Sequence, residues 1–108
     1  MVAARQVAMD LQVTRVRAVA RNREQRLRFT VGAERYQPQE RDGATFADRG
    51  PAKTLPAGVR IKECTASGDA ISFRAQGGAG SFGTVTLDNA SGDSQSISVS
   101  ITGRTRIR

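Results

Sequence analysis

The spacing of hydrophobic residues changes once along the chain, and this change restricts the possible folds. Residues 2–22 contain neither Gly nor Pro, and their apolar side chains recur every three to four residues, as in a helix. Leu27–Val31 instead alternates apolar and polar residues, which is typical of a half-buried strand. A helix followed by short strands predicts an α+β domain, with one N-terminal amphipathic helix packed on antiparallel β-sheet.

The length of 108 residues indicates a single domain, 1–108. We expect a helix over residues 1–24 and a β-rich part over residues 25–108. All three prolines and two glycines fall in residues 38–56, which we expect to form a long irregular loop. After the first strand, alternation predicts strands at 59–63, 70–74, 83–88, 96–101 and 104–107.

The helical segment carries two apolar stripes when it is plotted at 100° per residue. One stripe consists of Ala4, Val7, Ala8, Leu11, Ala18 and Val19. The other consists of Val2, Met9, Val13, Val16 and Ala20. The first is expected to pack on the sheet. The second predicts contact with other subunits through Met9, Val13 and Val16, unless its pattern is fortuitous.

The residue inventory argues against an enzyme. The sequence has no His and a single cysteine, Cys64, so the usual Ser or Cys triads and zinc sites are excluded. Gly78–Gly83 fits the pattern G-x-G-x-x-G, but the alternating segment TVTL follows it where a nucleotide-binding loop needs a helix. We therefore expect no catalytic residue, cofactor or metal, and interpret these glycines as a flexible connection between strands.

The charge balance points to an anionic partner. The formal net charge is +7 and the pI is about 11.2. Lys53 and Lys62 are the only lysines among 17 basic residues. A codon-biased genome explains the preference for Arg over Lys, but it leaves the surplus of positive charge unexplained. Nucleic acid, anionic lipid and acidic proteins are the partner classes that this charge favours.

The last residues, TGRTRIR, concentrate this charge. In a strand, Arg104, Arg106 and Arg108 would point to one face, spaced about 6.6 Å apart. This spacing is about twice the 3.4 Å rise per phosphate along one DNA strand. Gly103 is expected to free this tail from the preceding strand. The alternative is that the arginines protect a sheet edge from aggregation.

Three stretches form an ordered pattern over nearly the whole chain. Asp10–Arg15 reads DLQVTR, with Ala18 and Asn22 after it. Residues 55–59 read LPAGV and residues 71–77 read ISFRAQG. Residues 83–87 read GTVTL and residues 97–104 read ISVSITGR. This set resembles the GspH/FimT family of minor pilins and pseudopilins, although Arg17 stands where the family pattern has Glu.

The resemblance implies a pilin-like fold and other minor and major pilins as partners. The chain begins within a helical pattern, without a cap or a prepilin leader, so it resembles the soluble part of a longer protein. The resemblance then implies that the full-length form is anchored in the inner membrane with a periplasmic domain. After assembly it would stand in a pilus at the cell surface.

The resemblance leaves two functions open. FimT-like minor pilins of type IV pili are associated with DNA binding in natural transformation through a C-terminal G-R-x-R motif, which Gly103–Arg106 matches. This implies non-specific binding of DNA through Gly103, Arg104, Arg106 and Arg108. Arg26 and Arg28 would extend the surface if their strand lies near the tail. A type II secretion pseudopilin would instead act only in assembly of the pseudopilus tip.

Overall fold

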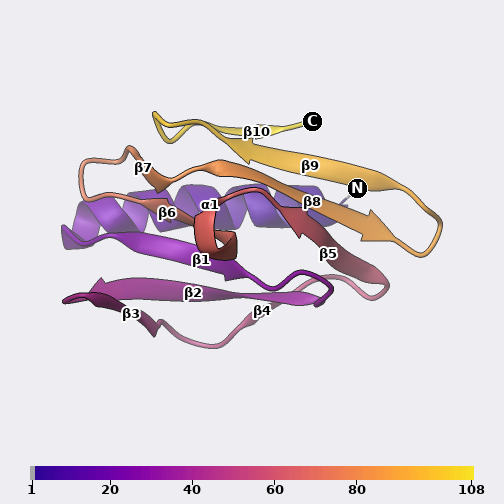
Figure 1. The fold of residues 1–108 in the computed structure, drawn as a ribbon, viewed down its shortest axis with the longest axis horizontal. Helices are drawn as coiled ribbons and strands as arrows, with labels where there is room; N and C mark the ends of the chain where they lie inside the picture. Colours follow the sequence, from indigo (N-terminus) through magenta and orange to yellow (C-terminus); the bar gives the residue numbers. More distant parts are fainter. Residues whose placement is uncertain (1) are drawn as a thin grey trace.

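The computed structural model describes residues 2–108 and shows one long helix lying across two antiparallel sheets (Figure 1). The helix α1 covers Val2–Arg21. It ends where Asn22 adopts a positive φ of 53°. The N–H groups of Asn22 and Arg23 then bond to the carbonyls of Val19 and Ala18 at 3.3 and 3.2 Å. This is the Schellman arrangement, which satisfies carbonyls at the helix end.

The first sheet has six strands in the order β3-β2-β1-β6-β7, with β4 also paired to β2. Its strands are β1 (Gln25–Phe29), β2 (Arg35–Asp42), β3 (Thr45–Asp48), β4 (Lys53–Thr54), β6 (Ala70–Phe73) and β7 (Ala79–Ser81). At the centre of this sheet, Leu27 of β1 lies opposite Pro38 of β2 on one side and Ile71 of β6 on the other. A short 3-10 helix, η1 (Ser67–Asp69), leads into β6.

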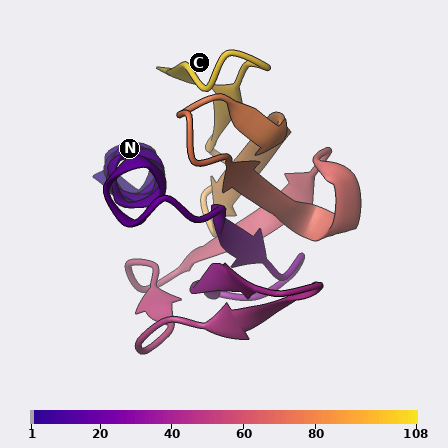
Figure 2. The same cartoon turned by 90° about the vertical axis from the view of Figure 1, so that its left-hand side faces the viewer.

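The second sheet has four strands in the order β10-β9-β8-β5. Its strands are β5 (Val59–Cys64), β8 (Gly83–Asn89), β9 (Ser94–Val99) and β10 (Thr105–Ile107). The helix contacts β1 and β6 of the first sheet and β9 and β10 of the second. Figure 2 shows α1 end-on, with both sheets on the same side of it.

The core lies between the helix and the inner faces of the two sheets. Its largest fully buried side chains include Leu11, Phe29, Tyr36, Phe73 and Ile97. Burial of these large apolar groups is the main favourable contribution to the packing of the helix on the two sheets. The predicted α+β class, with one N-terminal helix packed on antiparallel sheet, is confirmed.

The helix buries the first predicted stripe and exposes the second. Ala4, Val7, Leu11 and Ala18 are buried as expected, but Val19, assigned to the same stripe, is 53% exposed. Val19 belongs to the last turn of α1, and its side chain lies beside Gly77 at the surface instead of in the core. Thr14 is buried among the apolar residues because its hydroxyl donates to the carbonyl of Asp10 at 2.6 Å.

The prediction of a long irregular loop over residues 38–56 is wrong. Residues 38–42 belong to β2, and β3 and β4 lie within the remaining residues 43–56. Pro38 lies within β2 opposite Leu27, and its carbonyl accepts a hydrogen bond from Arg49 N–H at 2.9 Å. Proline lacks only the backbone donor, so a strand accommodates it where the ladder does not need that donor.

The glycine-rich segment 78–83 also differs from the flexible connection that we expected. Ala79–Ser81 forms β7 and pairs with β6. A Cβ atom on Gly80 would overlap the Glu24 carboxylate, which also accepts a hydrogen bond from the Ser72 hydroxyl at 2.8 Å. Gly80 therefore permits close packing. Gly83 opens the strand β8, so no helix follows this glycine pattern.

Candidate functional site

The C-terminal arginines lie on the edge hairpin of the second sheet. Strand β10 pairs with β9 with Arg106 opposite Ser98, and Ser98 in turn lies opposite Thr84 of β8. Cross-strand partners share a face of a sheet. Because the neighbouring positions Val85, Ile97 and Val99 are buried in the core, the row of Arg106, Ser98 and Thr84 lies on the outer face.

The three arginines line one shallow groove on this outer face, with a volume of about 480 Å³. We call it the arginine groove. Its lining residues are Phe82, Gly83, Thr84, Ser98, Val99, Ser100, Thr102, Arg104, Arg106 and Arg108. The groove therefore combines three guanidinium groups with hydroxyl groups and one aromatic ring, and no carboxylate is among its lining residues.

The arginines of this groove keep their charge available for a ligand. Among the ion pairs of residues 2–108, none involves Arg104, Arg106 or Arg108. All three residues are exposed. Guanidinium groups present paired N–H donors that match phosphate oxygens, so this arrangement is chemically suited to a phosphate-rich polymer.

Two backbone hydrogen bonds hold the turn that positions the tail. Gly103 is buried at a φ of +88°, and its N–H donates to the Ser100 carbonyl at 2.8 Å. The N–H of Ser100 in turn donates to the carbonyl of Arg104 at 3.0 Å. The expectation that Gly103 frees the tail is therefore wrong, because this glycine closes the β9–β10 hairpin.

Arg15 is a basic residue beside the tail that we did not single out from the sequence. It lines a second groove of about 510 Å³, on the helix side of the tail, together with Gln12, Val16 and residues 102–105. Its Nε atom donates to the carbonyl of Gly77 at 2.8 Å. The helical period places Arg15 on α1, but it carries no information about which strand lies opposite this residue.

Arg26 and Arg28 do not join the arginine groove. Both belong to β1 of the first sheet, whereas the tail belongs to the second sheet, and Figures 1 and 2 show β1 and β10 apart. The Arg26 guanidinium lies 3.9 Å from the centre of the Phe46 ring and donates to Gln39 at 2.6 Å. Burial, and then the charge of Arg28, lower the pKa of Arg26.

The exposed stripe of the helix forms a separate, apolar surface. Met9, Val13 and Val16 are 64%, 49% and 67% exposed. With Gln12 they line a shallow groove of about 320 Å³. Exposed apolar residues that line up in this way are typical of protein–protein contact, so we call these three residues the helix contact face.

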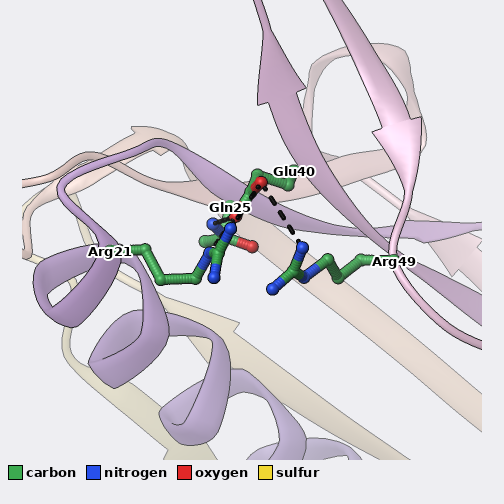
Figure 3. Close-up of polar contacts among 4 residues, drawn as sticks. All are labelled: Arg21, Gln25, Glu40 and Arg49. Carbon is green, nitrogen blue, oxygen red and sulfur yellow. Dashed lines mark hydrogen bonds and ion pairs between the residues drawn. The ribbon is translucent and has the colours of Figure 1, made fainter.

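A buried carboxylate joins the end of the helix to the first sheet (Figure 3). Glu40 of β2 accepts hydrogen bonds from Arg21 of α1 and, at 2.6 Å, from Gln25 of β1. Arg49 lies 3.7 Å from its other oxygen. Hydrogen bonding from Arg21, followed by that from Gln25, lowers the pKa of Glu40 to about 2. These bonds and the charges of Arg21 and Arg49 outweigh burial, which opposes the charged form, so the carboxylate stays ionised and the cluster has a structural role.

Residues 2–108 contain no group of three or more metal-ligating side chains close together. Cys64 is half-buried, and burial raises the pKa of its thiol. Burial therefore favours the neutral thiol, which is a poorer nucleophile than the thiolate. Over the same described range, no helix has both the length and the apolar character needed to cross a bilayer.

A helix laid across two antiparallel sheets, with one of its faces left exposed, defines a pilin-like protein. A family model described as "Type II transport protein GspH" matches residues 3–103. The chain therefore belongs to the GspH family. The resemblance to GspH/FimT pilins and pseudopilins that we found in the sequence is confirmed.

Solved structures agree with this assignment at the level of the fold. The minor pseudopilin EpsH of the type 2 secretion system of Vibrio cholerae is similar with a TM-score of 0.79 and 12% identity, over 99% of this chain and 94% of that one. The type IV minor pilin FimU of Pseudomonas aeruginosa is similar with a TM-score of 0.72 and 16% identity, over 98% and 90%. A comparison with curated protein sequences finds no significant match.

Proposed function

We propose that the chain is a minor pilin of a type IV pilus that binds DNA without sequence preference through the arginine groove. It would thereby support DNA uptake in natural transformation. The observation that carries this proposal is the convergence of Arg104, Arg106 and Arg108 on one groove without a lining carboxylate. Gly103 contributes by closing the hairpin that presents these arginines.

The binding follows from contacts to phosphate. Each arginine can form paired hydrogen bonds to a phosphate, and alternate residues of a strand are about 6.6 Å apart, so the three groups can follow one backbone. The groove contains none of the Asn or Gln side chains that read adenine, and it has no helix that enters a major groove. In this proposal the arginines contact phosphates and not base edges, so binding is insensitive to sequence and sensitive to salt.

The same chain also assembles with other pilins in this proposal. The helix contact face supplies an apolar surface on the side of α1 that faces away from the sheets. Before assembly the protein would stand on the periplasmic side of the inner membrane, and afterwards in the pilus at the cell surface. DNA and pilin partners thus use different faces of the molecule.

The second proposal is a minor pseudopilin of a type II secretion system that acts only in assembly of the pseudopilus tip. The family description and the likeness to EpsH favour it. It uses the helix contact face and assigns the tail arginines a protective role at a sheet edge. The two proposals differ in one property, which is whether the arginine groove binds DNA.

A DNA titration at two salt concentrations separates them. Three arginine–phosphate contacts give a slope of log K against log salt of about −2.7 on duplex DNA, or about a 40-fold loss between 50 and 200 mM. Arg104→Ala/Arg106→Ala should abolish binding. The control Arg28→Ala/Arg35→Ala removes the same amount of charge from exposed positions of the first sheet. This control variant should retain most of the DNA binding.

Two results would overturn the DNA proposal. Absence of binding at low salt would leave only the assembly function. Equal losses in the two double variants would show that net charge, and not the arginine groove, attracts DNA.

A further inference from the structure

Phe82 differs from the other aromatic residues of the chain in having a free ring. The sequence has four Phe and one Tyr. Phe29, Tyr36 and Phe73 are at most 1% exposed, and Phe46 lies against the guanidinium of Arg26. Phe82 is 51% exposed. Folding therefore leaves this ring available for contact with a ligand.

This ring lies in the arginine groove. Phe82 directly precedes β8, two residues before Thr84, and it lines the groove together with Arg104, Arg106 and Arg108. From β8 to β10 the sheet advances by two strand spacings, or about 10 Å. The groove thus has an aromatic wall on one side and a guanidinium wall on the other, with the hydroxyls of Thr84 and Ser98 between them.

We propose that the arginine groove prefers single-stranded DNA to duplex DNA, with a base stacked on Phe82. The inference rests on the proposed DNA function and specifies its ligand. Proteins that bind single strands combine a positive groove along the backbone with aromatic side chains on which bases stack. Here the arginines hold phosphates on one wall and a base turns toward Phe82 on the other.

Duplex DNA can contact the arginines of the groove but not the Phe82 ring. Its bases are stacked and paired inside the helix, so a ring on a shallow groove has no free base to contact, and a duplex is held by its phosphates alone. A flexible single strand can present both groups at once. Stacking has no hydrogen-bond readout, so the preference for single strands adds no sequence specificity.

Fluorescence anisotropy with a mixed-sequence 12-nucleotide strand and the duplex of the same length tests this proposal. Phe82→Leu keeps an apolar side chain and removes the ring. It should weaken single-strand binding by between about 5-fold and 100-fold, the range expected for one stacked base, and change duplex binding by less than about twofold. Phe82→Trp should retain the preference. Phe82 is half exposed, so both substitutions should leave the core packing intact. Thermal unfolding should verify that both variants remain folded.

The outcomes distinguish this inference from the function on which it rests. If the wild-type protein binds the duplex as tightly as the single strand, or if Phe82→Leu weakens both equally, base stacking is wrong. If Phe82→Leu leaves both affinities unchanged, the ring has another role, such as contact with a neighbouring pilin. The proposed DNA function itself fails if the wild type binds neither ligand at low salt, or if Arg104→Ala/Arg106→Ala weakens binding no more than Arg28→Ala/Arg35→Ala does.

Discussion

The carbonyl oxygen of Gly77 occupies the space that a Cβ atom on Gly103 would need. The same oxygen accepts a hydrogen bond from Nε of Arg15 at 2.8 Å. The Gly77 carbonyl, in the connection between β6 and β7, therefore contacts both Arg15 of the helix and Gly103 of the C-terminal turn. The glycine of the G-R-x-R motif serves this packing, and the arginines that follow it are positioned as a result.

Replacement of Gly103 by Ala should therefore destabilise the domain by more than backbone strain alone. A positive φ costs an L-residue about 1–2 kcal/mol, and the overlap with the Gly77 carbonyl adds to this. We expect a loss of about 3 kcal/mol or more in the free energy of unfolding, measured with urea.

Gly32→Ala is the matched control for this variant. Gly32 has a φ of +87°, close to the +88° of Gly103, but nothing lies within 4 Å of its missing Cβ. It should lose only the strain of about 1–2 kcal/mol. Equal losses in the two variants would show that the contact with Gly77 is unimportant.

A charge on the helix contact face should block assembly without affecting the fold. Val13 is 49% exposed, so Val13→Asp should change the free energy of unfolding by less than about 1 kcal/mol. An apolar contact with another pilin would bury the new carboxylate, which is strongly unfavourable. Counts of filaments on cells that carry the variant should fall, whereas DNA affinity in vitro should stay within about twofold.

Val31→Asp provides the comparison for this experiment. Val31 is 50% exposed, but it belongs to the turn after β1 and not to the helix. Filament counts in this variant should match the wild type. If both variants lose filaments to the same extent, the helix contact face has no special role.

The Glu40 cluster should make the free energy of unfolding depend on pH in the acid range. The pKa of Glu40 is lowered to about 2 in the folded protein, whereas an unperturbed Glu titrates near 4.3. The unfolded state therefore binds the proton first, and the free energy of unfolding falls as the pH drops from about 5 to about 2. The urea midpoint should decrease across this window.

Glu40→Gln should flatten this pH dependence and lower stability at neutral pH, because Arg21 and Arg49 lose their anionic partner. Glu63→Gln, at an exposed carboxylate, should leave the slope between pH 5 and pH 2 as in the wild type. If Glu40→Gln keeps the wild-type dependence of stability on pH between pH 5 and pH 2, Glu40 is not the group responsible for it.

Tyr36 should resist ionisation until the protein unfolds. It is 1% exposed, and its hydroxyl donates to Asp10. Burial, and then the bond to Asp10, raise the pKa of the phenol far above its ordinary value near 10. The neutral form is favoured in the fold, so stability is complete below pH 10 and decreases as the pH rises further.

Because Tyr36 is the only tyrosine, ultraviolet absorbance follows this group alone. The phenolate signal should appear together with the loss of structure in circular dichroism. In urea-unfolded protein the same signal should appear near pH 10. A reversible titration near pH 10 in the folded protein would contradict the buried hydrogen bond.

The sequence was most informative where spacing alone decides the structure. The 3.6-residue period identified the helix and its buried face, since Leu11 and Val7 are both fully buried. The two-residue period predicted the ends of most later strands to within two or three residues of their observed bounds. Predictions failed at Pro38 and Gly80, because residue type alone does not reveal whether a backbone donor is needed or a neighbouring side chain approaches closely.

The sequence by itself determined the α+β class, the two-faced helix and an arginine tail with alternating spacing, because these depend on the order of neighbouring residues. Only the tertiary structure decided what lies beside that tail. Strand pairing placed Phe82 in the groove with Arg106 and put Arg26 in the other sheet. Such adjacency depends on contacts between residues distant in the chain, which local periodicity does not encode.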